Sequence, residues 1–259
     1  MGSSGDLLQT AYLRDQQYSA PVAWAEFTHP NGRGRAALTA FLLGASLVLV
    51  PVLLLLLPSA APFAVYFTLL VLFHLLEYLL TAAFRPDTLS FDNFLLNHST
   101  SYQLMIALAC GEYWLELLTV DWLLFPGWKQ WGWVSSVGVI ACIVGLGARA
   151  IGMATASTNF SHKIEQSKRQ EHSLVTHGIY SYLRHPAYFG FFWWSVGTQL
   201  LLSNPISLVA YTAATFYFFY DRIPYEEELL IHFFGDRYRA YQQRTYIGIP
   251  FLYWAMRTF

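Results

Sequence analysis

The chain has 259 residues, of which 55% are apolar and 18% aromatic, while only 12% are charged. A soluble domain carries roughly 25% charged residues, so this composition excludes an ordinary water-facing globule as well as a disordered or collagen-like chain. The net charge of −1 gives no sign of a nucleic-acid partner, and the two cysteines, Cys110 and Cys142, offer neither a disulfide framework nor a metal-binding spacing. A membrane protein remains.

Six apolar segments are long enough to form helices that cross a bilayer, which takes about 20 residues. In chain order they are residues 36–57, 61–84, 102–125, 131–156, 186–203 and 205–220. The last two are joined only by Asn204 and Pro205, and so short a connection predicts a tight helical hairpin over residues 186–220. The predicted fold class is therefore all-α, a multi-pass transmembrane helical bundle of about six spans.

The spans divide the chain into three parts. Residues 1–35 form an N-terminal segment, residues 36–156 hold the first four spans, and residues 157–259 contain the hairpin and further C-terminal helices. Residues 1–35 show no separate apolar core with a cleavage site, so we expect no secretory signal there.

Basic residues fall almost entirely on one side of the predicted membrane. All except Lys129 and Arg149 flank the spans on the side that holds both termini. The positive-inside rule assigns this side to the cytosol. Asn97 and Asn159 each begin a glycosylation pattern, but both lie on this side, so we expect neither to be modified.

Several ionisable residues lie inside predicted spans, where a functional role is the default hypothesis. His74 and Glu77 are three residues apart, Glu112 and Glu116 are four apart, and Arg149 lies in the fourth span. They could line a transport pathway, or they could pair with one another and hold the bundle together. No His, Cys and Asp set has metal-ligand spacing, so we predict no metal site and favour the structural interpretation.

A polar stretch follows the fourth span. Residues 168–171 resemble an ordinary loop, but residues 172–186 combine three histidines, a glycine and two tyrosines next to a predicted helix start. Pro186 suits the first turn of that helix, because its missing N–H costs nothing there. His185 then lies at the helix N-terminus, where free backbone donors favour anionic groups.

A second polar cluster follows the sixth span. Pro224 is predicted to begin a cytosolic helix whose first turn contains residues 226–228, all glutamate, and whose end is marked by Gly235. Arg222 and Glu226 are four residues apart, so one helical turn would place them on the same face.

Together these segments resemble the isoprenylcysteine carboxyl methyltransferase family. The resemblance rests on residues 172–175 (HSLV), 177–180 (HGIY), 184–188 (RHPAY), 193–199, 204–205, 221–228 and 231–235, and it extends upstream to 41–46, 94–99 and 157–160. An isolated RHP motif is weak, because sterol reductases and phospholipid methyltransferases carry related C-terminal sequences. The full set in this order is specific.

The resemblance implies an enzyme of the endoplasmic reticulum membrane. Such an enzyme transfers a methyl group from S-adenosylmethionine to the carboxylate of a C-terminal farnesylated or geranylgeranylated cysteine on CaaX-processed proteins such as small GTPases, and releases S-adenosylhomocysteine. Residues 157–259 would be the catalytic region, with a cofactor pocket that faces the cytosol.

The family motifs also imply roles for individual residues. Arg222 would bind the substrate carboxylate as the catalytic residue. The implied cofactor contacts are Glu165, His172, Ser173, Leu174, Val175, Tyr180, His185, Pro186, Ala187, Tyr188 and Glu226. This sequence departs from the family at Glu165, where an amide such as glutamine is expected.

The chemistry of the reaction agrees with these residue types. A carboxylate is already ionised at pH 7, so its methylation needs no general base. Arg222 can hold the carboxylate with two parallel hydrogen bonds. A prenyl chain partitions into the bilayer, which predicts a lateral opening between spans, lined by apolar and aromatic residues that include 191–194.

Two other functions are compatible with parts of the sequence. An NADPH-dependent sterol reductase-like membrane enzyme could use the shared C-terminal region for a different nucleotide. A non-enzymatic transporter could use the intramembrane residues His74, Glu77, Glu112 and Glu116. Transporters usually contain internal repeats, and none is visible here.

Overall fold

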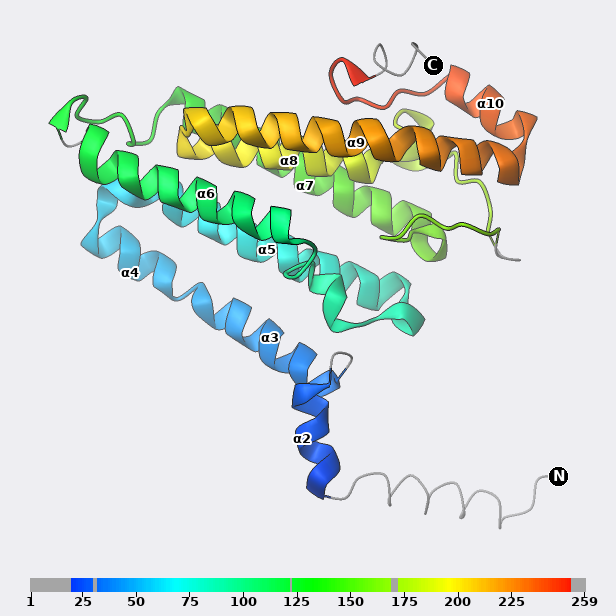
Figure 1. The fold of residues 1–259 in the computed structure, drawn as a ribbon, viewed down its shortest axis with the longest axis horizontal. Coiled ribbons are helices and arrows are strands. Elements are labelled where there is room, and N and C mark those ends of the chain that lie inside the picture. The colour runs from blue at the N-terminus through cyan, green and yellow to red at the C-terminus, as the bar shows by residue number, and fades with distance from the viewer. Residues whose placement is uncertain (1–19, 30–31, 122, 169–171, 253–259) are drawn as a thin grey trace.

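The computed structural model describes residues 20–29, 32–121, 123–168 and 172–252 (Figure 1). Much of the predicted N-terminal segment 1–35 and the last seven residues of the predicted catalytic region lie outside this part of the chain. The described residues form helices and no strand; a single bridge pairs Leu183 with Tyr246. The helices are α2 (Ala20–Thr28), α3 (Arg33–Ser46), α4 (Leu49–Leu56), α5 (Ala61–Phe84), α6 (Thr100–Glu116), α7 (Trp133–Ala156), α8 (Pro186–Leu202), α9 (Pro205–Phe234) and α10 (Asp236–Gln243).

The long helices lie roughly side by side. Figure 1 shows α7, α8 and α9 stacked together, α5 and α6 next to them, and α3 and α4 along the outer edge. Phe73 of α5 stacks on Trp194 of α8, with 4.2 Å between ring centroids, inside the larger cluster of buried apolar side chains. The core therefore lies where the N-terminal helices meet the hairpin.

Within the described residues, four helical segments are long and apolar enough to cross a membrane. They are Arg33–Leu56, Pro58–Phe84, Thr100–Asp121 and Trp133–Asn159. They coincide with the first four predicted spans. Helices α8 and α9 cover the predicted fifth and sixth spans, whose passage through the membrane stays a prediction.

Two of these spans differ from the predicted continuous helices. The first is interrupted between Ser46 and Leu49, which separates α3 from α4. The third leaves the α-helical path at Glu116, continues as a π-helical turn over Leu117–Asp121 and does not extend as a regular helix to residue 125. Beyond this turn, the Asp121 carboxylate accepts a hydrogen bond from the backbone N–H of Lys129 at 2.7 Å, which closes the following loop.

The most extensive helix interface joins α7 to α8 and depends on glycine. Gly138 and Gly145, seven residues apart on α7, face the backbone of Gly197 and Gly190 on α8. A Cβ atom on Gly145 would lie 2.6 Å from the Gly190 carbonyl oxygen, so only glycine permits this approach. Two helical turns after Gly145, Gly152 packs against Pro186. The interface thereby fixes where α8 begins.

Helices α8 and α9 form the predicted hairpin. Ser203 adopts a left-handed backbone conformation with φ 51°, and α9 begins at Pro205. The Glu112 carboxylate of α6 accepts hydrogen bonds from the backbone N–H groups of Ile206 and Ser207, at 2.7 and 2.6 Å. Glu112 therefore caps α9 from a neighbouring helix and satisfies donors that the first turn leaves free.

The prediction of a helix start at Pro224 is wrong, because α9 runs through this residue to Phe234. A proline inside a helix costs about 3 kcal/mol through one lost hydrogen bond and a steric clash. Burial of the adjacent Ile223 and the hydrogen bonds of Glu227 with Arg184 and His185 favour the continuous helix. The predicted end at Gly235 is confirmed, with φ 58° at this glycine.

The intramembrane ionisable residues are held by partners within the bundle. Arg149 of α7 donates from Nε and Nη2 to the two carboxylate oxygens of Glu77 on α5, the second bond measuring 2.8 Å. The Lys129 ammonium lies 2.6 Å from the Glu116 carboxylate, and His74 is hydrogen-bonded to a backbone carbonyl. The predicted pairing of Arg149 with an intramembrane carboxylate is thereby confirmed.

Candidate functional site

Two cavities adjoin in the C-terminal half of the bundle. The larger has a volume of about 980 Å³ and lies between α5, α6, α8, α9 and the loop over residues 157–166. The smaller, of about 130 Å³, lies between the end of α7, residues 172–188 and the helices α9 and α10. Phe160, Ser161 and Tyr188 line both cavities and therefore lie between them.

The smaller cavity gathers residues that the sequence predicts to act together. Its lining includes all the predicted cofactor contacts except one, namely His172, Ser173, Leu174, Val175, Tyr180, His185, Pro186, Ala187, Tyr188 and Glu226. The exception is Glu165, which lines the larger cavity and lies 3.7 Å from the Arg85 guanidinium. The structure thus places Glu165 apart from the other predicted cofactor contacts.

A buried carboxylate fixes the loop that precedes α8. Glu227 of α9 accepts hydrogen bonds from Arg184 Nε at 2.5 Å and His185 Nε2 at 3.0 Å, and Arg184 also donates to the Thr245 carbonyl oxygen. Burial alone would raise the pKa of Glu227, but the hydrogen bond from His185 and the charges of His185 and Arg184 lower this pKa to about 2. The ionised carboxylate therefore holds the start of α8 against α9.

Tyr188 connects the two cavities through its hydroxyl group. The hydroxyl donates to Glu226 Oε2 at 2.6 Å and accepts a hydrogen bond from Arg222 Nε at 2.8 Å. Arg222 lines only the larger cavity and Glu226 only the smaller one. The predicted substrate ligand and a predicted cofactor ligand therefore lie one helical turn apart and share one hydroxyl group.

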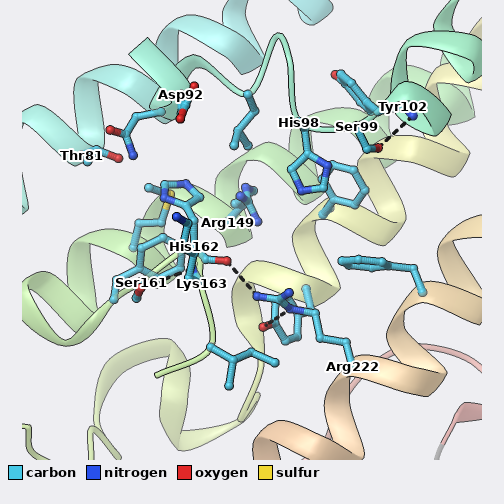
Figure 2. A pocket seen from close by; sticks show the side chains of 18 of the residues that line it. Thr81, Asp92, His98, Ser99, Tyr102, Arg149, Ser161, His162, Lys163 and Arg222 are labelled. Atoms are coloured by element: carbon cyan, nitrogen blue, oxygen red, sulfur yellow. Dashed lines mark hydrogen bonds between the residues drawn. The ribbon is translucent and has the colours of Figure 1, made fainter. Parts of the chain in front are cut away.

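The larger cavity has a positively charged region around Arg222. Figure 2 shows the side chains of His98, Arg149 and Arg222 directed toward the same space, and a hydrogen bond from Arg222 Nη2 to the His162 carbonyl oxygen, which measures 2.8 Å. Burial lowers the pKa of His98, and the charges of Arg222 and Arg149 lower it further. These effects favour the uncharged form of His98, and Arg222 supplies positive charge to this region because Arg149 is already paired with Glu77.

The rest of the larger cavity has a substantial apolar lining. Among its wall residues are Leu95, Met105, Phe191, Ala214, Phe218 and Phe219. Of the four residues 191–194 predicted to line a lateral opening, only Phe191 is among the residues that line the larger cavity. Consecutive residues on a helix point in directions about 100° apart, so four in a row cannot share one wall.

The sequence interpretation did not single out His98, Tyr102 or His162 as site residues, although all three line the larger cavity. A signal was available for two of them. His98 lies in residues 94–99, which carry part of the family resemblance. His162 lies two positions after residues 157–160, which also carry part of it. Tyr102 lies inside an apolar span and carries no comparable signal.

Comparison with known proteins gives concordant matches. The model of the "Isoprenylcysteine carboxyl methyltransferase (ICMT) family" matches residues 137–232. The chain is 46% identical over 191 residues to the protein-S-isoprenylcysteine O-methyltransferase of Xenopus laevis, covering 74% of this chain and 65% of that protein. It is 41% identical over 195 residues to the protein of the same name from Tribolium castaneum, covering 75% of this chain and 68% of that one.

A solved structure of the eukaryotic intramembrane Ras methyltransferase ICMT matches the fold with a TM-score of 0.79 at 37% sequence identity. The match covers 95% of this chain and 87% of the other. The chain thus spans most of the solved structure, but only about two thirds of the length of the Xenopus protein, 65%.

Proposed function

Since this chain belongs to the isoprenylcysteine carboxyl methyltransferase family, we propose that it transfers a methyl group from S-adenosylmethionine to the carboxylate of a C-terminal prenylated cysteine. Its acceptors would be CaaX-processed proteins such as small GTPases. The observation that carries the proposal is the pair of adjoining cavities, with Arg222 in one, Glu226 in the other and the Tyr188 hydroxyl between them.

The residues of the smaller cavity fit the methyl donor, which supplies an electrophilic methyl group on a positively charged sulfur. Glu226 offers a carboxylate to hydroxyl or cationic groups, and the buried Tyr238 hydroxyl has no hydrogen-bond partner among the described residues. At about 130 Å³ the enclosed space is smaller than the roughly 300–1,000 Å³ of ligand pockets in general. Part of the donor would therefore lie across the mouth of the cavity.

The larger cavity fits a lipidated acceptor with one charged end. Arg222 can hold the carboxylate, while apolar residues such as Met105 and Phe218 can contact a prenyl chain. These two residues belong to α6 and α9, which supports entry of the chain from the bilayer between these helices. Each CH₂ group that remains out of water favours this route by about 0.8 kcal/mol.

The site residues have to align the reactants rather than move a proton. The acceptor carboxylate is ionised at neutral pH, and its negative charge is consumed as the ester forms. A water-poor cavity with Arg222 at the carboxylate therefore need not stabilise a new ion. Fixing the attacking oxygen in line can supply roughly 7–11 kcal/mol of the barrier reduction.

We place the enzyme in the endoplasmic reticulum membrane with both termini and both cavities on the cytosolic side, and count residues 186–203 and 205–220, which lie in α8 and α9, as the fifth and sixth spans. The distribution of basic residues supports this orientation. The same orientation allows a water-soluble, charged donor to reach the smaller cavity from the cytosol.

Methyl transfer to a small prenylcysteine tests the proposal directly. The purified chain, supplied with radiolabelled S-adenosylmethionine and N-acetyl-farnesylcysteine, should form a base-labile methyl ester. Arg222→Ala should remove most of this activity and leave the affinity for S-adenosylhomocysteine nearly unchanged, because Arg222 lines only the larger cavity. The control Arg239→Ala changes an exposed arginine and should retain full activity.

Two outcomes would contradict the proposal. Full activity of a folded Arg222→Ala variant would remove the carboxylate role. Binding of NADPH in place of S-adenosylhomocysteine, with no ester formed, would favour a reductase.

A further inference from the structure

The loop between the two cavities is held in place by contacts with helix α5. We infer that residues 160–165, here named the partition segment, orient Arg222 for the reaction, and that His162 is the positioning residue. The inference rests on the proposed function, in which Arg222 binds the acceptor carboxylate.

Two of the five N–H groups of the Arg222 guanidinium are already engaged. Nε donates to the Tyr188 hydroxyl at 2.8 Å, and Nη2 donates to the His162 carbonyl oxygen at 2.8 Å. Among the described residues, Nη1 donates to none. Because the Nε side is occupied, the carboxylate would bind across the end of the guanidinium, to Nη1 and the remaining hydrogen of Nη2.

The His162 side chain fixes the backbone carbonyl that Arg222 contacts. His162 Nε2 lies 2.9 Å from Glu77 Oε2. Glu77 is only 2% exposed and is paired with Arg149, which in turn donates to the Ala187 carbonyl oxygen at 3.1 Å. The carbonyl is thereby tied to α5, α7 and α8 through one imidazole ring.

A second contact comes from Arg85, the residue that follows α5, and holds the partition segment at its beginning and end. Arg85 donates from Nη1 to the Phe160 carbonyl oxygen at 2.6 Å and lies 3.7 Å from the Glu165 carboxylate. The wall between the two cavities is therefore set by residues that come long before the catalytic region in the chain. Without these contacts the long Arg222 side chain would lose a partner that restricts its rotamers.

A substitution of His162 tests this role, because it releases the segment and leaves the backbone carbonyl in the chain. A displacement of about 1 Å at a reacting group can cost roughly 100-fold in rate. We expect His162→Ala to lower kcat for N-acetyl-farnesylcysteine about 10- to 100-fold, while the affinity for S-adenosylhomocysteine and the thermal unfolding midpoint stay nearly unchanged. His162→Gln should recover most of the rate, because an amide can still bond to Glu77.

Two further variants separate positioning from general damage. His232→Ala changes an exposed histidine that lines neither cavity, so full activity is expected. In an Arg222→Lys background, which lacks the guanidinium, His162→Ala should lower the residual rate less than twofold.

The proposal is overturned if the rate losses of His162→Ala and Arg222→Lys multiply in the double variant. It is also overturned if His162→Ala weakens S-adenosylhomocysteine binding, or if His162→Gln recovers none of the rate. Failure of the carboxylate role is seen separately, as full activity of Arg222→Ala alone.

Discussion

Individual carboxylates in this protein bind several partners at once. Glu77 contacts Arg149 and His162, and Glu227 contacts Arg184 and His185. Each carboxylate lies on a helix that borders the cavities. Its side chain bonds to a loop residue or to the start of another helix. Loss of one such group therefore removes a connection between elements as well as a charge.

Glu227 provides a test of pH dependence at this scale. Its pKa in the folded protein is about 2, below the ordinary value of 4.5, so its stabilising contribution is fully present above pH 4.5 and is lost as the pH falls toward 2. At pH 7, Glu227→Gln should lower the unfolding midpoint in detergent by several degrees. The difference from the unaltered protein should shrink between pH 4.5 and 3.

Glu228→Gln is the matched control for this measurement, because Glu228 is exposed. It should leave the unfolding midpoint unchanged throughout. A Glu227→Gln deficit that stays constant from pH 7 to pH 3 would show that ionised Glu227 contributes no stability.

At the scale of elements, the approach of α7 to α8 determines where the loop before α8 ends. The glycines of the two helices meet backbone to backbone, and Gly152 packs against Pro186 at the start of α8. A shift of α8 along this interface would move His185 and Tyr188, which line the smaller cavity. The glycines therefore influence the geometry of the site although they are not among the residues that line either cavity.

A pair of alanine substitutions tests this interface. Gly145→Ala would place a Cβ atom 2.6 Å from the Gly190 carbonyl oxygen, whereas a Cβ atom on Gly147 meets nothing within 4 Å. Gly145→Ala should lower the unfolding midpoint by several degrees and reduce activity, because the helices have to separate. Gly147→Ala should match the unaltered protein, and equal effects of the two variants would argue against a close-packed interface.

At the scale of the whole molecule, the proposed reaction joins a water-soluble donor to a membrane-bound acceptor. The smaller cavity is lined by loop residues and the ends of helices, while the larger one extends between α6 and α9. The two reactants would thus arrive from different phases and meet at Tyr188. This arrangement makes the lipid chain part of substrate recognition.

Acceptors with and without the prenyl group test this division. A farnesylated cysteine analogue should have a kcat/KM at least 100-fold above that of the unprenylated compound, because only the former contacts the apolar walls and is concentrated in the membrane. Equal values of kcat/KM for the two compounds would exclude entry from the bilayer.

Local patterns in the sequence predict much of this fold. Runs of apolar residues locate the first four membrane-capable helices, Asn204 with Pro205 predicts the hairpin, and Gly235 predicts the end of α9. The motif residues 172–188 are close in the chain, so a common cavity follows almost directly from their spacing.

Contacts between distant residues could not be predicted in the same way. His162 and Glu77 are 85 positions apart, and no local pattern marks them as partners. The predicted helix start at Pro224 was wrong because the tertiary contacts of the neighbouring residues outweigh the free-energy cost of a proline inside a helix. Glu165 was predicted from the family resemblance, whereas in the structure it lines the larger cavity and lies 3.7 Å from Arg85, which directly follows α5.

The buried ammonium of Lys129 has a consequence for biogenesis. Its Nζ donates to the carbonyl oxygens of Leu202 and Ser203 and to Asn204 Oδ1, in addition to its contact with Glu116. Of these four partners only Glu116 precedes Lys129 in the chain. During synthesis Glu116 is therefore available as a counter-ion before α8 and α9 are made, and these helices pack over a charge that is already paired.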